Sequence, residues 1–419
     1  MTYPFLKDLR VIESSAFIAA PLAGLALAQF GAQVIRVEMI GGGIDYGRMP
    51  RMPRDDGGLG RSLYWTALNK GKRSIAIDLR RPEGRELIQA LATAPGPEAG
   101  VLLTNIGTPW LAHEVLAKRR ADVISCTIQG NGDGSTAVDY TVNCATGYPM
   151  VTGGGSEQRP VNHVLPAWDV TCAYYAAFSI ASAVDSRRRT GQGAELKLAL
   201  SDIAFTTLSH LGVLAEAELL GQERPSVGNH VYGAFGRDFG TSDGHRLMVV
   251  GISAGQWKSL VAACGLQQAI TELERRSGLD LSDEEQRFAA RDEIAALIEP
   301  WFAARTREQA EQELGKHRAT WGRYGTAGEL LAHDTRASVA NPVFERITTP
   351  GVGEHLSAGS PVRAPALQRQ PTSPAPLLGT HTDQVLHEVL GLDSAAIGRL
   401  HDAGIVAGPD RDPTVAPRG

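Results

Sequence analysis

Short apolar strands alternate with helices through the first 150 residues of this 419-residue chain, and this alternation predicts an α/β protein with a parallel sheet. A strand, a helix and a second strand follow one another within about 30 residues, which is the length of one βαβ unit. With 43% hydrophobic and 21% charged residues, the chain can bury a sizeable core and divide into two or three domains.

The first βαβ unit lies close to the N-terminus. Residues 9–13 (LRVIE) are expected to form a strand, residues 21–30 a helix rich in alanine and leucine, and residues 33–38 (QVIRVE) a second strand. Gly31 is expected to end the helix, because glycine readily adopts the conformation that follows a helix C-terminus.

The same pattern recurs further along the chain. Strands are expected at residues 73–79 (RSIAIDL), 100–104 (GVLLT) and 121–128 (ADVISCTI), with a helix at residues 82–93 that Pro82 opens. This order predicts a doubly wound, Rossmann-like domain. The glycine motifs GxGxxG and GxxxxGK[ST] are absent from the places where such a domain would carry them, which argues against NAD or ATP as the ligand.

The second half of the chain begins with a long helix. It is expected to start at Pro166 and to end at Thr190, with Gly191 as its C-cap. A strand at residues 194–200 and a helix at residues 201–220 are expected next. Residues 221–228 (GQERPSVG) are polar and typical of a domain boundary, a strand is expected at residues 246–251, and residues 408–419 are expected to be frayed.

Charge and cysteine content exclude several classes of protein. Lysine and arginine total 41 against 46 acidic residues, and a net charge of -5 argues against a nucleic-acid partner. The four cysteines show neither a disulfide framework nor metal-binding spacing, which favours a reducing cytoplasmic location and no metal site. The apolar residues 16–28 are too short to cross a membrane, and the acidic residues before them are atypical of a signal peptide.

Asp169, in the segment HVLPAWDVTCAYYA, is the main candidate for chemistry. It follows Pro166 by three positions, so it is expected in the first turn of the long helix, where the helix dipole favours an ionised carboxylate. Such a carboxylate can attack an activated acyl group as a nucleophile. The alternative is that Asp169 only caps the helix, since aspartate is common at helix N-termini.

Several segments together resemble family III CoA-transferases. They are SSAFIAAPLAGLALAQFGAQVIRVE, NKGKRSIAIDLRRPEGRELI, AWDV, RRTGQGAELKLALSD, TSDGHRLMVV and LLGTHTDQVLHEVLGL. The resemblance implies that Asp169 is a nucleophile, that CoA arrives as part of an acyl-CoA thioester, and that no prosthetic group is present. It also implies a homodimer with interlocked chains. The domains would be a large Rossmann-like domain at residues 1–224 and 346–407 and a smaller α/β domain at residues 225–345.

Other segments resemble the members of this family that move CoA between the two carboxyl ends of one mesaconate. These segments are GGGIDYGR, WTALNKGKRSIAID, VDYTVN, VNHVLPAWD, GNHVYGAFGRDF, RLMVVG and DEIAALIEPWF. A CoA-transferase acting between two dicarboxylic acids, an acyl-CoA racemase and an inactive CoA-binding protein are the alternatives.

The resemblance also implies which residues bind the substrate. The expected CoA contacts are Ile18, Ala19, Ile77, Asp78, Leu79, Arg80, Asn105, Ile106, Gly107, Asp139 and Tyr140. Since a cation or a hydroxyl donor must hold the second carboxylate, the expected partners for that group are His163, His230, Tyr232 and Arg237. Backbone amides at residues 153–155 are expected to stabilise oxyanions.

Two positions depart from the family pattern. Met39 and His113 stand where relatives often carry arginine. Recognition of the CoA phosphates is therefore expected to use other basic residues, for which the candidates are Arg48, Lys70, Lys72 and Arg73.

Overall fold

The computed structural model describes residues 2–153, 159–221 and 224–415. They divide into two compact units. Unit 1 comprises Met1–Thr146, Val164–Ala215 and Thr335–Gly419, and unit 2 comprises Gly147–His163 and Glu216–Asp334.

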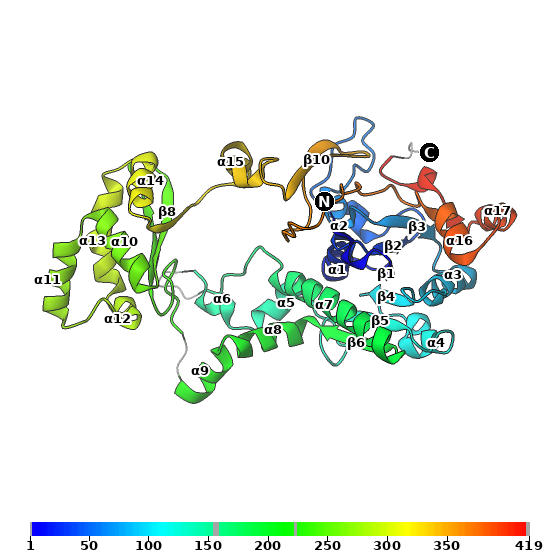
Figure 1. Cartoon of the computed structure of the whole chain (residues 1–419), viewed down its shortest axis with the longest axis horizontal. Helices are drawn as coiled ribbons and strands as arrows, with labels where there is room; N and C mark the ends of the chain where they lie inside the picture. The colour runs from blue at the N-terminus through cyan, green and yellow to red at the C-terminus, as the bar shows by residue number, and fades with distance from the viewer. Residues whose placement is uncertain (1, 154–158, 222–223, 416–419) are drawn as a thin grey trace. The chain divides into compact units, whose positions relative to one another are not determined.

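A seven-stranded sheet forms the centre of unit 1 (Figure 1). Its strand order is β12-β3-β2-β1-β4-β5-β6, and every neighbouring pair is parallel except β12 with β3. The strands are β1 (Arg10–Ser14), β2 (Gln33–Glu38), β3 (Arg73–Ile77), β4 (Val101–Thr104), β5 (Ile124–Gln129), β6 (Ala194–Ala199) and β12 (Val406–Ala407). The order 3-2-1-4-5-6 is that of a doubly wound domain. The predicted α/β class is confirmed, with a mixed sheet that is mostly parallel.

Helices cover both faces of this sheet. Ile12, Ile35 and Leu102 are fully buried in a core shared with α3 and α16, while α1 packs against α7 beside β1, β2 and β5. The helices of unit 1 are α1 (Ala19–Gln29), α2 (Leu63–Asn69), α3 (Pro82–Thr93), α4 (His113–Ala117), α5 (Asp139–Cys144), α7 (Ala167–Thr190), α8 (Leu200–His210), α16 (Thr382–Leu390) and α17 (Ser394–Asp402). An antiparallel hairpin, β10 (Phe344–Thr349) and β11 (Gly353–Ala358), completes the unit.

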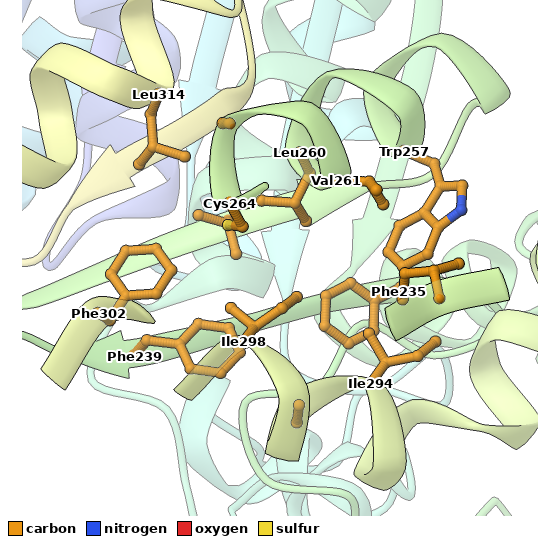
Figure 2. Close-up of a cluster of buried hydrophobic side chains, with 14 of the residues drawn as sticks. Phe235, Phe239, Trp257, Leu260, Val261, Cys264, Ile294, Ile298, Phe302 and Leu314 are labelled. Carbon is orange, nitrogen blue, oxygen red and sulfur yellow. The ribbon is translucent and has the colours of Figure 1, made fainter. Parts of the chain in front are cut away.

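Unit 2 has a three-stranded antiparallel sheet with helices packed on it. Figure 2 shows its core, in which Phe235 and Phe239 of the first strand lie among side chains of the surrounding helices. The strands are β7 (Phe235–Gly240), β8 (Arg246–Gly251) and β9 (Thr320–Arg323). The helices are α6 (Tyr148–Val151), α10 (Ala254–Cys264), α11 (Gln267–Ser277), α12 (Glu284–Ala289), α13 (Arg291–Ala303), α14 (Arg307–Lys316) and α15 (Ala327–His333), and α9 (Val213–Leu220) spans the boundary between the units.

Two segments differ from the prediction. The helix expected at residues 201–220 is interrupted after His210, where Gly212 adopts a φ of 76° that a continuous helix does not allow. The segment expected to be frayed is packed at Asp412 and Thr414. The carboxylate of the fully buried Asp412 accepts hydrogen bonds from the backbone amides of Leu378 and Thr414, each at 2.8 Å.

Among the described residues, no single helix is long and apolar enough to cross a membrane. The bent pair α8 and α9 meets that criterion by length and composition only.

Candidate active site

A cavity of about 480 Å³ lies in unit 1, where the carboxyl ends of β1, β4 and β5 meet the first turn of α7. In a doubly wound sheet the neighbouring strands β1 and β4 form the switch point, which is where such folds bind their ligands. The residues that line the cavity are Phe17, Ile18, Ala19, Arg48, Tyr64, Asn105, Ile128, Gln129, Gly130, Ala137, Val138, Asp139, Tyr140, Val164, Pro166 and Asp169.

Asp169 lies in the first turn of α7 without capping that helix. The backbone amides of Trp168 and Asp169 donate instead to Oδ2 of Asp139, at 2.7 and 3.0 Å. The carboxylate of Asp169 forms no hydrogen bond with any described residue and lines the cavity. The cap is therefore a residue of α5, and the carboxylate of Asp169 is left for another role.

The electrostatic environment of Asp169 differs from the sequence-based expectation. The pKa of this carboxyl is raised to about 7, first by burial and second by the charge of Asp139, while Arg48 opposes both effects. The helix dipole was expected to favour the ionised form, but the loss of solvation outweighs it. A carboxylate with a raised pKa is a stronger nucleophile than an ordinary aspartate while remaining partly ionised near neutral pH.

Trp168 fixes the start of α7 against α5. Its indole Nε1 donates to Oδ1 of Asn143 at 3.1 Å, and only 5% of the tryptophan is exposed. Because Asp139 and Asn143 lie one turn apart on α5, the two helices are joined by both backbone and side-chain hydrogen bonds. This packing gives Asp169 a defined position.

The loop after β1 forms another wall of the cavity. Phe17 has a φ of 65°, which is uncommon for a residue other than glycine, and its amide donates to Oδ2 of Asp45 at 2.8 Å. Asn105 holds the same loop by accepting from the amide of Ala16 at 2.9 Å and donating to its carbonyl at 2.6 Å. Five of the expected CoA-binding residues line this cavity: Ile18, Ala19, Asn105, Asp139 and Tyr140.

A second cavity of about 220 Å³ lies at the ends of β1 and β2. Leu79 and Ile106, both expected to contact CoA, line it together with Met39. Arg36 also lines it, and its guanidinium donates to Glu13 at 2.7 Å and to Glu38 at 3.1 Å. Met39 places an uncharged side chain at this cavity.

The other expected CoA contacts line neither cavity. Ile77 is fully buried in the core of the sheet, so its side chain is not open to a ligand. Asp78 and Arg80 pair with each other at 2.8 Å, and the Arg80 side chain is 77% exposed. Gly107 is not part of either lining.

Three of the four proposed phosphate-binding residues already have partners. Lys72 is buried 2.9 Å from Glu13, Lys70 donates to Oγ of Ser357 at 2.9 Å, and Arg73 pairs with Glu388 at 2.8 Å. The fourth, Arg48, lines the cavity together with Asp169.

His113 is not positioned as a free cation. Its Nδ1 lies 2.8 Å from Oγ of Ser125, and it lines neither cavity.

The residues expected to hold the second carboxylate all belong to unit 2. Nε2 of His230 lies 3.7 Å from Asp292, Tyr232 donates to Glu216 at 2.9 Å, and the Arg237 guanidinium lies 5.6 Å from the ring centre of Phe239. His163 is the last residue of the first segment of unit 2. The structure describes each unit by itself, so this assignment stays a prediction.

Two further sequence-based expectations concern oxyanion stabilisation and metal binding. Of the three glycines expected to stabilise oxyanions, Gly154 and Gly155 lie outside the described residues. Among the residues that the structure does describe, no group of three or more His, Cys, Asp or Glu side chains is arranged to hold a metal ion.

Two of the site residues that sequence reasoning missed, Tyr64 and Phe17, are aromatic. Both rings line the cavity and both lie against the guanidinium of Arg48. Tyr64 stands in no segment that indicates chemistry, and Phe17 lies in the first family-like segment, where its apolar ring indicates no binding role. The segment RSLYWTAL that contains Tyr64 has only the pattern of an ordinary short helix.

Comparison with known proteins identifies the family. Residues 6–382 match the family model for CoA-transferase family III. The chain belongs to CoA-transferase family III. This match confirms the predicted resemblance. Acyl-CoA thioesters are the substrates of this family.

Among family III proteins, 2-methylfumaryl-CoA isomerase of Chloroflexus aurantiacus is 50% identical over 407 residues, which are 97% of this chain and 98% of that one. Formyl-CoA:oxalate CoA-transferase of Rhodopseudomonas palustris is 29% identical over 96% of this chain and 98% of its own. A crystal structure of a CAIB/BAIF family protein from Brucella suis covers 93% of this chain and 100% of its own with a TM-score of 0.75 at 24% identity, which supports the fold.

Proposed function

We propose that this family III enzyme transfers CoA within one molecule, converting 2-methylfumaryl-CoA (mesaconyl-C1-CoA) into 3-methylfumaryl-CoA (mesaconyl-C4-CoA). The observation that carries this proposal is the carboxylate of Asp169, which does not cap its helix and lines the cavity at the switch point of the sheet. The 50% identity to the isomerase over nearly the full length supports the choice of substrate.

The first exchange separates CoA from the acyl group. Asp169 attacks the thioester carbonyl, the carbon–sulfur bond breaks, and CoA leaves as a thiolate, so that a mixed anhydride joins Asp169 to mesaconate. The thiolate then attacks the Asp169 carbonyl of this anhydride. An aspartyl-CoA thioester forms as the anhydride bond breaks, and mesaconate, with both carboxylates now free, stays bound in the cavity.

The second exchange runs in the reverse sense at the other end of the acid. The C4 carboxylate attacks the aspartyl-CoA thioester, giving a new anhydride and the thiolate. The thiolate attacks the mesaconyl carbonyl, which forms mesaconyl-C4-CoA and restores the Asp169 carboxylate. Each step exchanges one activated acyl group for another, so the reaction needs no ATP.

Retention of the acid distinguishes this reaction from transfer between two different acids. An acid held beside the aspartyl thioester has a very high effective concentration, which favours its own second carboxylate over acids from solution. The proposed CoA contacts along this path are those predicted residues that line the two cavities: Ile18, Ala19, Leu79, Asn105, Ile106, Asp139 and Tyr140.

We further propose that the enzyme works in the cytoplasm as a homodimer with interlocked chains and serves carbon fixation through 3-hydroxypropionate. These assignments rest on the resemblance to its family. Its substrate brings the CoA, and no prosthetic group takes part.

An isotope experiment tests the proposed reaction. The enzyme is incubated with mesaconyl-C1-CoA and an excess of labelled free mesaconate, and the products are analysed by mass spectrometry. Formation of the C4 thioester without label is expected. Label in the thioester would instead show transfer between separate acids, which is the activity named for the 29% identical relative. Absence of conversion would exclude mesaconate as the acyl group.

A further inference from the structure

Arg48 lines the same cavity as Asp169, and neither the fold nor the proposed transfer gives this cation a role. It follows the short 3-10 helix Ile44–Gly47, and its backbone amide donates to the carbonyl of Asp45 at 3.2 Å. Its guanidinium forms no ion pair or hydrogen bond with any side chain among the described residues. A half-buried arginine without a counter-ion is suited to an anionic ligand.

Two aromatic rings fix the position of this guanidinium. Cζ of Arg48 lies 4.7 Å from the ring centre of Tyr64 and 5.1 Å from that of Phe17, both within the range of cation–π contacts. An arginine in contact with two rings loses little entropy on binding, and a guanidinium that makes no hydrogen bond to a side chain keeps its donors for a carboxylate. Arg48 and both rings line the same cavity, so the guanidinium borders the proposed substrate space.

The hydroxyl of Tyr64 supplies a second donor without a partner. Its oxygen is buried and has no hydrogen-bond partner among the described residues. Burial raises the pKa of this phenol to about 12, so it remains protonated and able to donate at neutral pH. A buried hydroxyl without a partner is costly, and a ligand oxygen would remove that cost.

The carboxylates that face Arg48 are Asp45 and Asp169. Asp45 already accepts from the amide of Phe17 at 2.8 Å and lies 3.8 Å from Arg36. Asp169 becomes uncharged when it is acylated, which removes one of the two carboxylates that face Arg48 during the transfer.

We propose that Arg48, assisted by the hydroxyl of Tyr64, binds the carboxylate of the mesaconyl group that is not joined to CoA. This inference rests on the proposed function, because both the C1 and the C4 thioester carry one free carboxylate. A single cationic site serves both thioesters, since the free carboxylate is C4 before the CoA changes position and C1 afterwards, and each binds Arg48 in turn. The assignment places this role in unit 1, whereas the sequence-based candidates lie in unit 2.

A binding experiment tests the proposal without turnover. In the Asp169→Asn enzyme, dissociation constants are measured by calorimetry for mesaconyl-C1-CoA and for (E)-2-methylcrotonyl-CoA, in which a methyl group replaces the free carboxylate. Adding Arg48→Gln is expected to weaken binding of mesaconyl-C1-CoA by roughly 30-fold or more. Binding of the methyl analogue should change by less than about threefold.

Matched variants separate the competing explanations. Arg51 is exposed three residues further along the same loop, and Arg51→Gln is expected to change neither constant. Equal weakening of both ligands by Arg48→Gln would show that Arg48 binds CoA itself, for example a phosphate. A loss selective for mesaconyl-C1-CoA in Arg237→Gln, with none in Arg48→Gln, would also overturn the proposal.

A second readout distinguishes carboxylate binding from a structural role. With Asp169 intact, Arg48→Gln is expected to raise the fraction of labelled mesaconate that enters the thioester, because the acid escapes between the two exchanges. Arg48→Lys should restore part of the retention by replacing the charge. A slower Arg48→Gln enzyme that still excludes label as completely as the natural one would contradict the proposal. If the natural enzyme itself incorporates label, the proposed function fails while the binding result still stands by itself.

Discussion

The carboxylate of Asp139 accepts a hydrogen bond from the backbone amide of Asp169 at 3.0 Å. One aspartate therefore caps α7, and the other is left to line the cavity from the first turn of the same helix. The pair also brings two like charges close together, which contributes to the raised pKa of Asp169.

Substitutions of Asp139 are expected to separate its two effects. Asp139→Asn keeps an acceptor for the amides of Trp168 and Asp169 but removes the charge, so the pKa of Asp169 should fall. The midpoint of the pH–activity profile should move to lower pH, with stability nearly unchanged. Asp139→Ala also removes the cap and should cost at least about 1 kcal/mol in urea unfolding. An unchanged pH midpoint in the asparagine variant would show that the two carboxylates do not interact.

The rate is expected to depend on the ionisation of Asp169. Because the nucleophile is the carboxylate and its pKa is about 7, kcat/KM for mesaconyl-C1-CoA should rise tenfold per pH unit below pH 7 and level off above it. Initial rates measured from about pH 5.5 to pH 8.5 in buffers of constant ionic strength test this prediction. A flat profile over this range would mean that Asp169 ionises with an ordinary pKa.

Removing the charge of Asp169 is expected to stabilise the protein. A carboxyl whose pKa is raised on folding destabilises the folded state once the unfolded chain ionises, and this cost is complete above the folded pKa. Asp169→Asn should therefore be more stable than the natural protein by roughly 2–4 kcal/mol at pH 8, with the gain decreasing as the pH falls from 7 towards 4. Urea unfolding at several pH values measures it. A gain that persists unchanged at pH 4 would have another cause.

Gly24 of α1 is expected to tolerate no side chain. A Cβ at this position would lie 1.8 Å from Oε2 of Glu13, whose carboxylate forms a buried ion pair with Lys72. Gly24→Ala should cost roughly 3 kcal/mol or more in urea unfolding, because it displaces a buried charge from its partner. Ala26→Gly in the same helix provides a comparison and should cost only about 1 kcal/mol. Similar losses in both variants would show that the ion pair can rearrange.

The fold could largely be predicted because its elements follow local rules. The strand β2 has the bounds that hydrophobic periodicity after Gly31 predicts, and the helix α3 begins at Pro82 as predicted. The break between α8 and α9 could not be predicted, because Gly212 in a helical pattern is compatible with either a continuous or an interrupted helix.

The site was only partly predictable, for a different reason. Asp169 was identified by its place at the start of a helix and by resemblance, whereas its raised pKa comes from burial and from Asp139, 30 residues earlier in the chain. Arg48 and Tyr64 meet only in the folded protein, on the loop after β2 and on α2. Contacts of this kind between distant segments leave no periodic signal in the sequence.

Trapping the covalent intermediate tests the central claim most directly. The enzyme is incubated with mesaconyl-C1-CoA and quenched with hydroxylamine, which attacks anhydrides and thioesters at the acyl carbon, and its peptides are analysed by mass spectrometry. A hydroxamate at Asp169 is expected, absent without substrate and absent in Asp169→Asn. Conversion to the C4 thioester with no hydroxamate at Asp169, or with one at another carboxylate, would contradict the account.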